Sequence, residues 1–233
     1  MLVAVVDDDD AHNEHIAQIL RREGHGCVAF TRPTAFLREA QRQTFDLLIT
    51  DWTMPEATGV EIIRQIRSGS APTLPILMLT SRSSEQEIVE ALRAGADDFL
   101  VKPITAPVLA ARVEALLRRA YAQEARRSWQ FGRYGFDAAK ETIEIDGEAI
   151  TLTTKEFRLA WLFFQNLGRP LSRDYLLHVV WNRRGDVETR TLDAHVSRIR
   201  VKLGLRPANG YRLVTVYGFG YRLEAIDIEA PTP

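Results

Sequence analysis

Apolar runs and amphipathic segments alternate through the first half of the chain. Short apolar runs bounded by turn residues lie at 2–6, 26–30, 46–50, 75–79 and 98–101. Helical spacing of apolar residues follows each run, at about 12–23, 34–42, 59–67, 84–94 and 106–120. Five buried strands that alternate with five helices predict an α/β fold, a doubly wound five-stranded parallel sheet with helices on both faces.

The pattern changes in the second half. Residues 131–153 alternate with the period of β-strands around a DG turn. Three amphipathic helices are predicted next, in TKEFRLAWLFFQNLG, SRDYLLHVVW and TRTLDAHVSRIRVKLG, the first with Thr153 or Thr154 as its N-cap. YRLVTVYGFGYRLEAI then predicts two strands around a glycine-rich turn. This order of sheet, three helices and hairpin indicates an α+β domain.

The change of pattern also predicts the domain boundaries. The first domain is expected at 1–120, and the polar segment 121–128 reads as a short linker. The second domain is expected at 129–227, with a frayed tail at 228–233.

The composition is that of a globular protein, with 45% hydrophobic and 26% charged residues. No stretch approaches the roughly 20 apolar residues of a membrane-spanning helix. The N-terminus has no basic region or cleavage pattern of a signal peptide. The single cysteine, Cys27, lies in an apolar run and reads as a core residue. A cytoplasmic protein without a membrane partner is therefore expected.

The net charge of −1 conceals an asymmetry between the two halves. Residues 1–120 carry 13 Lys/Arg and 17 Asp/Glu, a net −4, and the remainder carries 17 and 14, a net +3. Within 183–206 there are seven basic and three acidic residues. The first half is therefore expected to meet cations, and the second half polyanions.

Four aspartates, Asp7 to Asp10, follow the first strand directly, and Asp51 follows the third. Two carboxylates about 5 Å apart repel by roughly 3 kcal/mol at an effective dielectric constant near 20. Either water solvates these side chains in an acidic loop or a cation holds them. In a doubly wound sheet the strand ends form one ligand-binding edge, where carboxylates suit Mg²⁺. The spacing of a calcium-binding loop is absent.

Two further strand ends add a hydroxyl, that of Thr80, and an ammonium group, that of Lys102. Together with Mg²⁺, these groups would offset charge on a phosphoryl group that is transferred to a carboxylate. Asp51 is assigned as the nucleophile, with Asp7 and Asp8 holding the metal. A phosphatase with an aspartyl nucleophile would use the same groups, but it would leave the second half of the chain without a role.

The first half resembles the receiver domain of two-component response regulators, through VVDDD, DLLITDWTMPEATG, ILMLTS and GADDFLVKP. The resemblance implies a flavodoxin-like fold in which Asp51 is the phosphoacceptor. It implies that Asp8 binds Mg²⁺ directly, Asp7 binds it through water and Thr53 supplies its carbonyl. Lys102 would contact the phosphoryl group, and Thr80 and Phe99 would form the switch pair. Phe99 lacks the hydroxyl that tyrosine supplies in many relatives.

The second half resembles the winged-helix domain of the OmpR/PhoB family, through LTTKEFRLAWLF, LSRDYLLHVVW, TRTLDAHVSRIRVKL and YRLVTVYGFGYRL. Residues 190–203 would be the recognition helix, with Arg198 reading a base in the major groove. The residues expected at the DNA are Arg190, His195, Ser197, Arg198, Arg200, Thr215 and Tyr217. Ser197 and Tyr217 replace basic residues of many relatives, which predicts a shallower salt dependence. A solvated helix beside an edge hairpin is the alternative.

The resemblance implies a DNA-binding transcriptional regulator that a histidine kinase phosphorylates and that catalyses nothing beyond its own phosphoryl transfer and dephosphorylation. Phosphorylation would produce a homodimer that binds two half-sites of double-stranded DNA about one helical turn apart, and RNA polymerase is a further candidate partner. The dimer face would comprise Ile88, Arg93, Asp97, Asp98, Val108, Arg112, Glu114 and Arg119. An orphan regulator of the same fold, without control by phosphorylation, is the alternative function.

Overall fold

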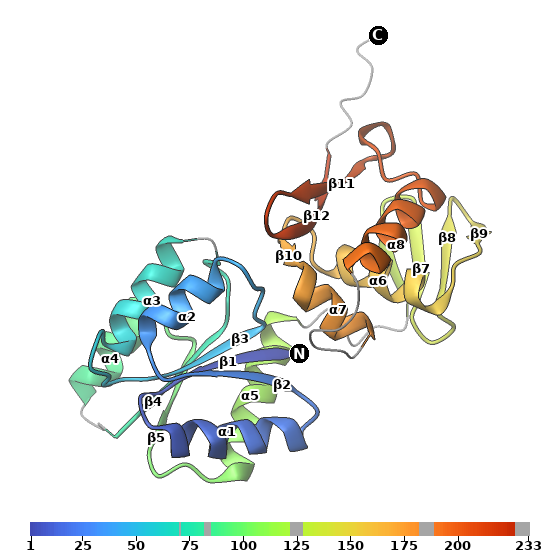
Figure 1. The fold of residues 1–233 in the computed structure, drawn as a ribbon. Helices are drawn as coiled ribbons and strands as arrows, with labels where there is room; N and C mark the ends of the chain where they lie inside the picture. The colour runs from blue at the N-terminus through green and yellow to red at the C-terminus, as the bar shows by residue number, and fades with distance from the viewer. Residues whose placement is uncertain (70, 82–84, 122–127, 182–188, 227–233) are drawn as a thin grey trace. The chain divides into compact units, whose positions relative to one another are not determined.

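The structure is a computed structural model that describes residues 1–69, 71–81, 85–121, 128–181 and 189–226. It divides into two compact units, Met1–Ala122 and Gln123–Pro233, and each is described by itself (Figure 1).

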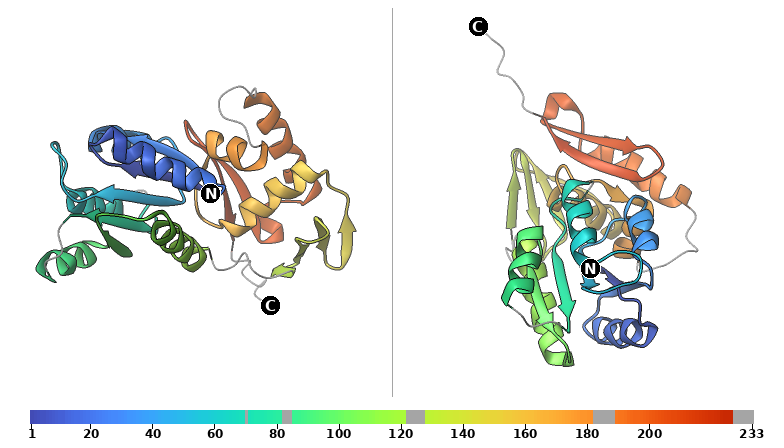
Figure 2. Two further views of the ribbon diagram at one scale, coloured as in Figure 1. Left: turned by 90° about the horizontal axis from the view of Figure 1, so that it is seen from below. Right: turned by 90° about the vertical axis from the view of Figure 1, so that its left-hand side faces the viewer.

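The first unit is a parallel sheet in the strand order β2-β1-β3-β4-β5, with helices on both of its faces (Figures 1 and 2). Its strands are β1 (Leu2–Val6), β2 (Gly26–Phe30), β3 (Leu47–Asp51), β4 (Ile76–Thr80) and β5 (Asp98–Val101). Its helices are α1 (Asp10–Arg22), α2 (Pro33–Ala40), α3 (Gly59–Ser68), α4 (Glu85–Ala94) and α5 (Ala106–Ala120). The predicted doubly wound sheet is confirmed.

Two strands start and end one residue later than the apolar runs suggest. Asp46 is buried, and its carboxylate accepts a hydrogen bond from Leu2 N at 2.8 Å, so this residue belongs to the turn before β3. At the other end of β3, Asp51 stays in the strand ladder opposite Leu79 of β4. The phosphoacceptor candidate is therefore the last residue of a fixed strand, not the first residue of a loop.

The two faces of the sheet bury different side chains. One face packs on α1 and α5, where Ile16, Leu20, Val113 and Leu116 meet alternate residues of the strands, with Cys27 among them as predicted. On the opposite face the rings of Phe30, Phe36 and Phe45 contact one another at 5.6–6.1 Å between centroids. Burial on both faces fixes the positions of all the strand ends.

The described residues of the second unit form a four-stranded antiparallel sheet, three helices and a three-stranded sheet of order β10-β12-β11. Its first sheet comprises β6 (Ser128–Phe131), β7 (Tyr134–Asp137), β8 (Thr142–Ile145) and β9 (Glu148–Ile150). The helices are α6 (Thr154–Gln165), α7 (Arg173–Trp181) and α8 (Thr189–Lys202), followed by the 3₁₀ turn η2 (Pro207–Asn209). The last sheet comprises β10 (Leu171–Ser172), β11 (Tyr211–Val216) and β12 (Gly220–Ala225).

Two features of this unit differ from the prediction. Ser128, expected in the linker, is the first residue of β6 and pairs with Asp137 of β7. β10 was missed because two residues are too few to show periodicity. Its Leu171 carbonyl approaches Gly220 so closely that a Cβ there would lie 2.1 Å from the oxygen. Tyr121, also expected in the linker, is the C-cap residue of α5. The remaining linker residues 122–127 and the tail 228–233 lie outside the described residues.

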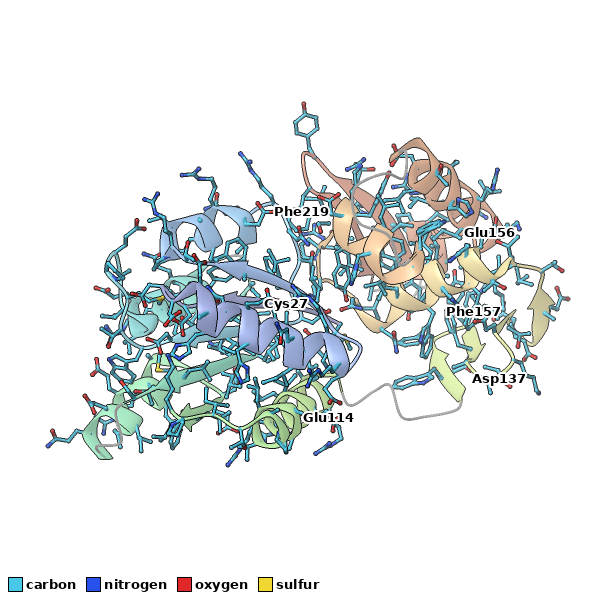
Figure 3. The ribbon with its side chains drawn as sticks, turned by 60° about the horizontal axis from the view of Figure 1, so that its bottom comes forward. Cys27, Glu114, Asp137, Glu156, Phe157 and Phe219 are labelled. Atoms are coloured by element: carbon cyan, nitrogen blue, oxygen red, sulfur yellow. The ribbon has the colours of Figure 1, made fainter. Side chains whose placement is uncertain are left out.

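Thr153, rather than Thr154, caps α6. Its hydroxyl accepts from Glu156 N, and the Glu156 carboxylate accepts from Thr153 N at 2.9 Å, which completes a capping box. Behind this cap, Phe157 and Phe164 of α6 pack on Phe136 of β7. Figure 3 labels Glu156 and Phe157, which both lie on this helix.

Candidate functional site

Carboxylates and an ammonium group meet at the carboxyl edge of the parallel sheet. Asp7 follows β1, Asp51 ends β3 and Lys102 follows β5, and the strand order brings these ends together. The Lys102 Nζ lies 2.7 Å from Asp51 Oδ1 and 3.0 Å from Asp7 Oδ2. Residues separated by up to 95 positions along the chain thus share one ion-pair cluster.

Burial makes this cluster electrostatically strong. Asp7, Asp51 and Thr80 are all buried, whereas the neighbouring Asp8 is exposed. Burial alone would lower the pKa of Lys102, but its hydrogen bonds to Asp51 and Asp7 and their charges raise that pKa above the ordinary value. The ammonium group therefore stays protonated, and two carboxylates face one cation.

The loop after β3 holds the Asp51 side chain in place. Thr53 N donates to Asp51 Oδ2 at 3.1 Å, and Gly59 N donates to the Trp52 carbonyl at 2.8 Å. A Cβ on Gly59 would lie 2.2 Å from the Asp51 carbonyl oxygen, so only glycine fits there. The loop therefore fixes one carboxylate oxygen and leaves the other to Lys102.

The four consecutive aspartates have different roles. Asp7 is in the cluster, where its Oδ1 accepts from Asp9 N at 2.9 Å. Asp9 caps α1 by accepting from the backbone N–H groups of His12 and Ala11, which lower the pKa of its carboxyl group. Asp10 is the first residue of the helix. Asp8 is exposed next to Asp7. The four residues therefore contribute to the ion-pair cluster, to the N-cap of α1 and to its first turn.

The donor set can be tested against the Mg²⁺ that the sequence implied. The carboxylates of Asp7 and Asp51 share one cationic group, the Lys102 ammonium, and together carry more negative charge than it neutralises. Hard, anionic oxygens of this kind are typical Mg²⁺ ligands. Among the described residues no three His, Cys, Asp or Glu side chains form a metal cluster, so Asp8 does not join this pair here. The chemistry of these carboxylates fits the ion, and Asp8 lies exposed next to Asp7.

The predicted switch pair occupies adjacent strands. Thr80 ends β4 and is buried, and Phe99 of β5 is half-buried opposite Met78. His12 was missed by the sequence reasoning although its Nδ1 lies 3.4 Å from the Lys102 Nζ. Its position in the first turn after the aspartates was the only available indication.

In the second unit, α8 divides into a buried face and an exposed face as predicted. Leu192, Val196, Ile199 and Leu203 are buried against the core. Ser197 and Arg198 are exposed on the opposite side. The side chain of Arg190 lies outside the described residues. Of the predicted DNA contacts on α8, Ser197 and Arg198 thus have the exposure that readout requires.

Two other predicted contacts are bonded within the unit. The Arg200 guanidinium donates to the Leu213 carbonyl at 3.0 Å and to the Thr215 hydroxyl at 3.3 Å, which connects α8 to β11. The His195 Nδ1 lies 2.8 Å from the Thr191 carbonyl, and its ring packs edge-on against Trp181. Both side chains therefore help to hold α8 in place.

The hairpin of β11 and β12 carries the remaining predicted contacts. Tyr217 lies in its turn and is fully exposed, and Thr215 is also exposed. Gly218 and Phe219 complete the turn, where Gly218 has a φ of +71°. Behind the hairpin, Tyr221 donates a hydrogen bond to Asp193 of α8. The hairpin is thus joined to α8 at both Arg200 and Asp193.

The elements of the predicted dimer face, α4, β5 and α5, carry exposed apolar side chains. Val89, Leu92, Val101 and Val108 are exposed on α4, β5 and α5, and Ile88 is half-buried beside them. Arg112 pairs with Asp98 at 3.0 Å within the chain.

The charged residues of that face differ in whether they are exposed or bonded within the unit. Arg93, Glu114 and Arg119 are exposed. The Glu114 charge is close enough to His25 to oppose the lowering of the His25 pKa by burial. Asp97 accepts from Arg67 and from Ile76 N, both at 2.8 Å, and so it holds its own unit together.

Comparisons with known proteins agree with this geometry. Residues 3–114 match the family model described as response regulator receiver domain, and residues 147–223 match transcriptional regulatory protein, C terminal. The sensory transduction protein RegX3 of Mycobacterium tuberculosis is 36% identical over 225 residues, which cover 95% of this chain and 98% of that protein. The phosphate regulon transcriptional regulatory protein PhoB of Rhizobium meliloti is 36% identical over 224 residues, covering 96% and 98%.

Among solved structures, a CheY-like response regulator receiver domain protein of Methanospirillum hungatei is 25% identical with a TM-score of 0.50, covering 52% of this chain and 97% of that one. A receiver followed by a DNA-binding domain defines a response regulator of a two-component system. The chain belongs to the OmpR/PhoB family of these regulators, and it is a transcriptional regulator controlled by phosphorylation. Within the described residues, every helix is too short or too polar to cross a membrane.

Proposed function

We propose that Asp51 accepts a phosphoryl group from a partner histidine kinase and that this switches the affinity of the second unit for DNA. The observation that carries the proposal is the position of the Lys102 ammonium group between Asp51 and Asp7. A buried carboxylate that ends a strand, beside a cation that can follow a phosphoryl oxygen, has the arrangement that phosphoryl transfer needs.

The transfer itself requires little movement of the protein. One carboxylate oxygen of Asp51 attacks the phosphorus atom of the phosphohistidine, and the bond from phosphorus to the donor nitrogen breaks. The imidazole leaves with the electron pair, and Asp51 becomes an acyl phosphate. Lys102 then moves its hydrogen bond from the carboxylate to a phosphoryl oxygen, and the Thr80 hydroxyl donates to another.

Mg²⁺ would be held by the carboxylates of Asp7, Asp8 and Asp51 and by the Thr53 carbonyl. When bound, the ion offsets the charge that develops on the transferring phosphoryl group. Asp7 and Asp51 are buried and fixed, so only Asp8 has to reorient. The exposure of Asp8 leaves it free to do so.

The phosphorylated receiver is proposed to dimerise through α4, β5 and α5. The exposed side chains of Val89, Leu92, Val101 and Val108 offer apolar area there, and burial contributes about 25 cal/mol per Å². Movement of Thr80 toward the phosphoryl group would let Phe99 turn inward. This change in packing connects the site to the dimer face.

DNA is proposed to bind along the exposed face of α8. Arg198 would read a base in the major groove, and Arg200, Thr215 and Tyr217 would lie toward the adjacent backbone. Ser197 and Tyr217 carry no charge, so the affinity is expected to fall less steeply with salt than in relatives with basic residues there.

The first experiment is labelling with acetyl phosphate in the presence of Mg²⁺. The wild type should be labelled, the Asp51→Asn variant should not, and Asp10→Asn should behave as the wild type because Asp10 is an exposed first-turn residue. Persistent Mg²⁺-dependent labelling of Asp51→Asn would place the acceptor elsewhere, with Asp8 the next candidate.

A second experiment addresses DNA. Selection of binding sequences with phosphorylated and unphosphorylated protein should enrich the same repeated half-sites, with tighter binding in the phosphorylated sample. Equal enrichment and affinity in the two samples would contradict control by phosphorylation.

A further inference from the structure

His12 lies at the phosphorylation site although nothing in the proposed chemistry uses it. It is in the first turn of α1, where its backbone N–H donates to the Asp9 carboxylate at 3.2 Å. Its side chain is about half exposed, and its Nδ1 points at the Lys102 Nζ at 3.4 Å. The helix cap therefore fixes where this imidazole stands.

The ammonium group of a lysine has three N–H donors and no acceptor. Three polar side-chain atoms lie close to the Lys102 Nζ, namely Asp51 Oδ1 at 2.7 Å, Asp7 Oδ2 at 3.0 Å and His12 Nδ1 at 3.4 Å. In the neutral tautomer that carries its proton on Nε2, Nδ1 accepts from Lys102, and the same Nδ1 lies 3.6 Å from Asp7 Oδ2 and 3.8 Å from Asp9 Oδ2. In that tautomer His12 supplies the ammonium group with a third acceptor, one that carries no charge.

We propose that His12 is a positioning residue for phosphoryl transfer, which acts by holding the Lys102 ammonium group at the mouth of the site. The proposal rests on the proposed role of Asp51. During transfer the Lys102 contact to Asp51 is exchanged for a contact to a phosphoryl oxygen. His12 and Asp7 keep the other two donors occupied meanwhile, so the ammonium group does not have to be reoriented.

The chain offers an unusually clean way to observe this ammonium group. It contains four lysines, and Lys102 is the only one in residues 1–122. The Nζ–H resonances of Lys102 can therefore be identified by comparing nitrogen-15 spectra of the full chain with those of a Lys102→Arg variant. Protection of these protons from exchange reports directly on how firmly the group is held.

Three variants separate the contact from the bulk of the side chain. His12→Asn keeps an acceptor atom near the place of Nδ1, and His12→Leu keeps the volume without an acceptor. His15→Leu is the matched control, because His15 is exposed on the same helix. The full chain is phosphorylated with acetyl phosphate and Mg²⁺, and the maximal rate is separated from the half-saturating donor concentration.

His12→Leu is expected to lower the maximal rate about three- to fivefold, as loss of a partly exposed hydrogen bond to a charged group should. The half-saturating concentration should stay nearly constant, and exchange of the Lys102 ammonium protons should accelerate. His12→Asn should restore both quantities, and His15→Leu should change neither.

Wild-type rates and unchanged ammonium exchange in His12→Leu would overturn the inference. So would a His12→Asn variant as slow as His12→Leu, since the effect would then come from the ring and not from the acceptor. The exchange measurement uses unphosphorylated protein, so it tests the contact even if Asp51 is not the acceptor. Labelling of Asp51→Asn would refute the proposed acceptor and would leave the exchange result to decide the role of His12.

Discussion

A lysine ammonium group meets a buried carboxylate in both units of the chain, but the balance of charge differs. In the receiver, Lys102 stands between Asp7 and Asp51, with Asp8 next to them. In the second unit, as far as the structure describes it, Lys202 forms its ion pair with Glu156, at 2.7 Å, and also donates to the Thr151 carbonyl at 3.2 Å. The first cluster carries excess negative charge, and the second is neutral.

This difference separates a binding site from a structural ion pair. Glu156 has its partners inside the fold, because it accepts from Thr153 N and from Lys202 and thereby closes the cap of α6. The receiver cluster has one cation for two buried carboxylates, so it gains from a further cation. A buried ion pair with no net charge, such as Lys202 with Glu156, is satisfied within the fold. A buried cluster with excess negative charge, such as that of Asp7, Asp51 and Lys102, is stabilised further when a cation binds.

The largest expected effect comes from adding that cation. Mg²⁺ should stabilise the receiver, because it relieves repulsion among Asp7, Asp8 and Asp51, and a ligand that binds only the native state contributes about 2.7 kcal/mol at a hundredfold excess over its dissociation constant. Hydrogen exchange of the full chain should show greater protection of β1 and β3, with no change in α6 and α8. Removal of the metal by a chelator should reverse the gain. If millimolar Mg²⁺ changes the protection of neither unit, the carboxylates of Asp7, Asp8 and Asp51 do not bind the ion.

The next effect concerns which arginine of α8 is free to meet DNA. Arg198 is exposed, so Arg198→Ala should cost about 1–3 kcal/mol of binding free energy on the specific site and relax preference at one base position. Arg200 connects α8 to β11 through its hydrogen bonds to Leu213 and Thr215. Because Arg200→Ala loosens this connection without removing a base contact, it should weaken binding to all DNA sequences alike. Affinities for the specific site, for single-base variants and for random DNA measure both effects. Equal losses on specific and random DNA for Arg198→Ala would contradict base readout.

A smaller effect tests the balanced pair directly. Lys202→Met should lower the free energy of unfolding of the second unit, since it leaves the Glu156 carboxylate buried without its cation. The expected loss is only about 1–2 kcal/mol, because the Lys202 side chain is partly exposed and water already screens the pair. Lys140→Met is the matched control, because Lys140 is largely exposed where it pairs with the half-buried Asp137, and this pair should contribute less than about 0.5 kcal/mol. Labelling of Asp51 should be unaffected in both. Equal stability of the two variants would show that the Glu156 pair is not structural.

The same pair predicts a pH dependence. Burial would raise the pKa of Glu156, but Lys202 and the Thr153 N–H lower it below the ordinary value of 4.5. A group whose pKa is depressed on folding stabilises the native state above its unfolded pKa. This stability is lost as the pH falls below about 4.5 through the folded pKa. Denaturant unfolding across pH should show this loss in the wild type, and the loss should shrink in Glu156→Gln.

Much of this architecture could be predicted from the sequence because burial imposes periodicity. The apolar runs located the five parallel strands, and their ends located Asp51, Thr80 and Lys102. The spacing of Leu192, Val196, Ile199 and Leu203 identified the core side of α8 correctly. Where packing determines which side of a helix or strand is buried, the pattern of apolar residues was sufficient to predict that side.

The pattern could not show which polar groups are already bonded. Arg200 and Asp97 were assigned to surfaces that meet partners, yet each holds its own unit together through groups distant in sequence. His12 reaches Lys102 across 90 positions, and no local spacing reveals such a contact. Hydrogen bonds between distant segments depend on tertiary structure, so charge counts alone overestimate the side chains that are available for binding.

The smallest effect concerns the charged residues of the proposed dimer face. It tests whether their charges balance across the interface, as those of Lys202 and Glu156 do within the second unit. The resemblance to the OmpR/PhoB family implies that Arg93 and Glu114 stand where relatives commonly have a pair of the opposite signs, and both side chains are exposed. In a two-fold dimer each Arg93 can meet the partner's Glu114, so a homodimer attracts itself and a relative with the usual signs is disfavoured. Each exposed pair should contribute only about 0.5 kcal/mol.

Most of the dimer stability should instead come from the apolar side chains, because Val108 and Leu92 are exposed at 47% and 45%. The dimer should therefore depend weakly on salt. Sedimentation of the full chain activated with beryllofluoride, at several salt concentrations, measures this. Arg93→Glu should weaken the dimer slightly, and addition of Glu114→Arg should restore it, whereas Val108→Asp should abolish it. If Val108→Asp leaves dimerisation intact, α4, β5 and α5 do not form the interface. If only the charge reversal is silent, the apolar side chains alone hold the dimer and the reversed pair has no part in partner choice.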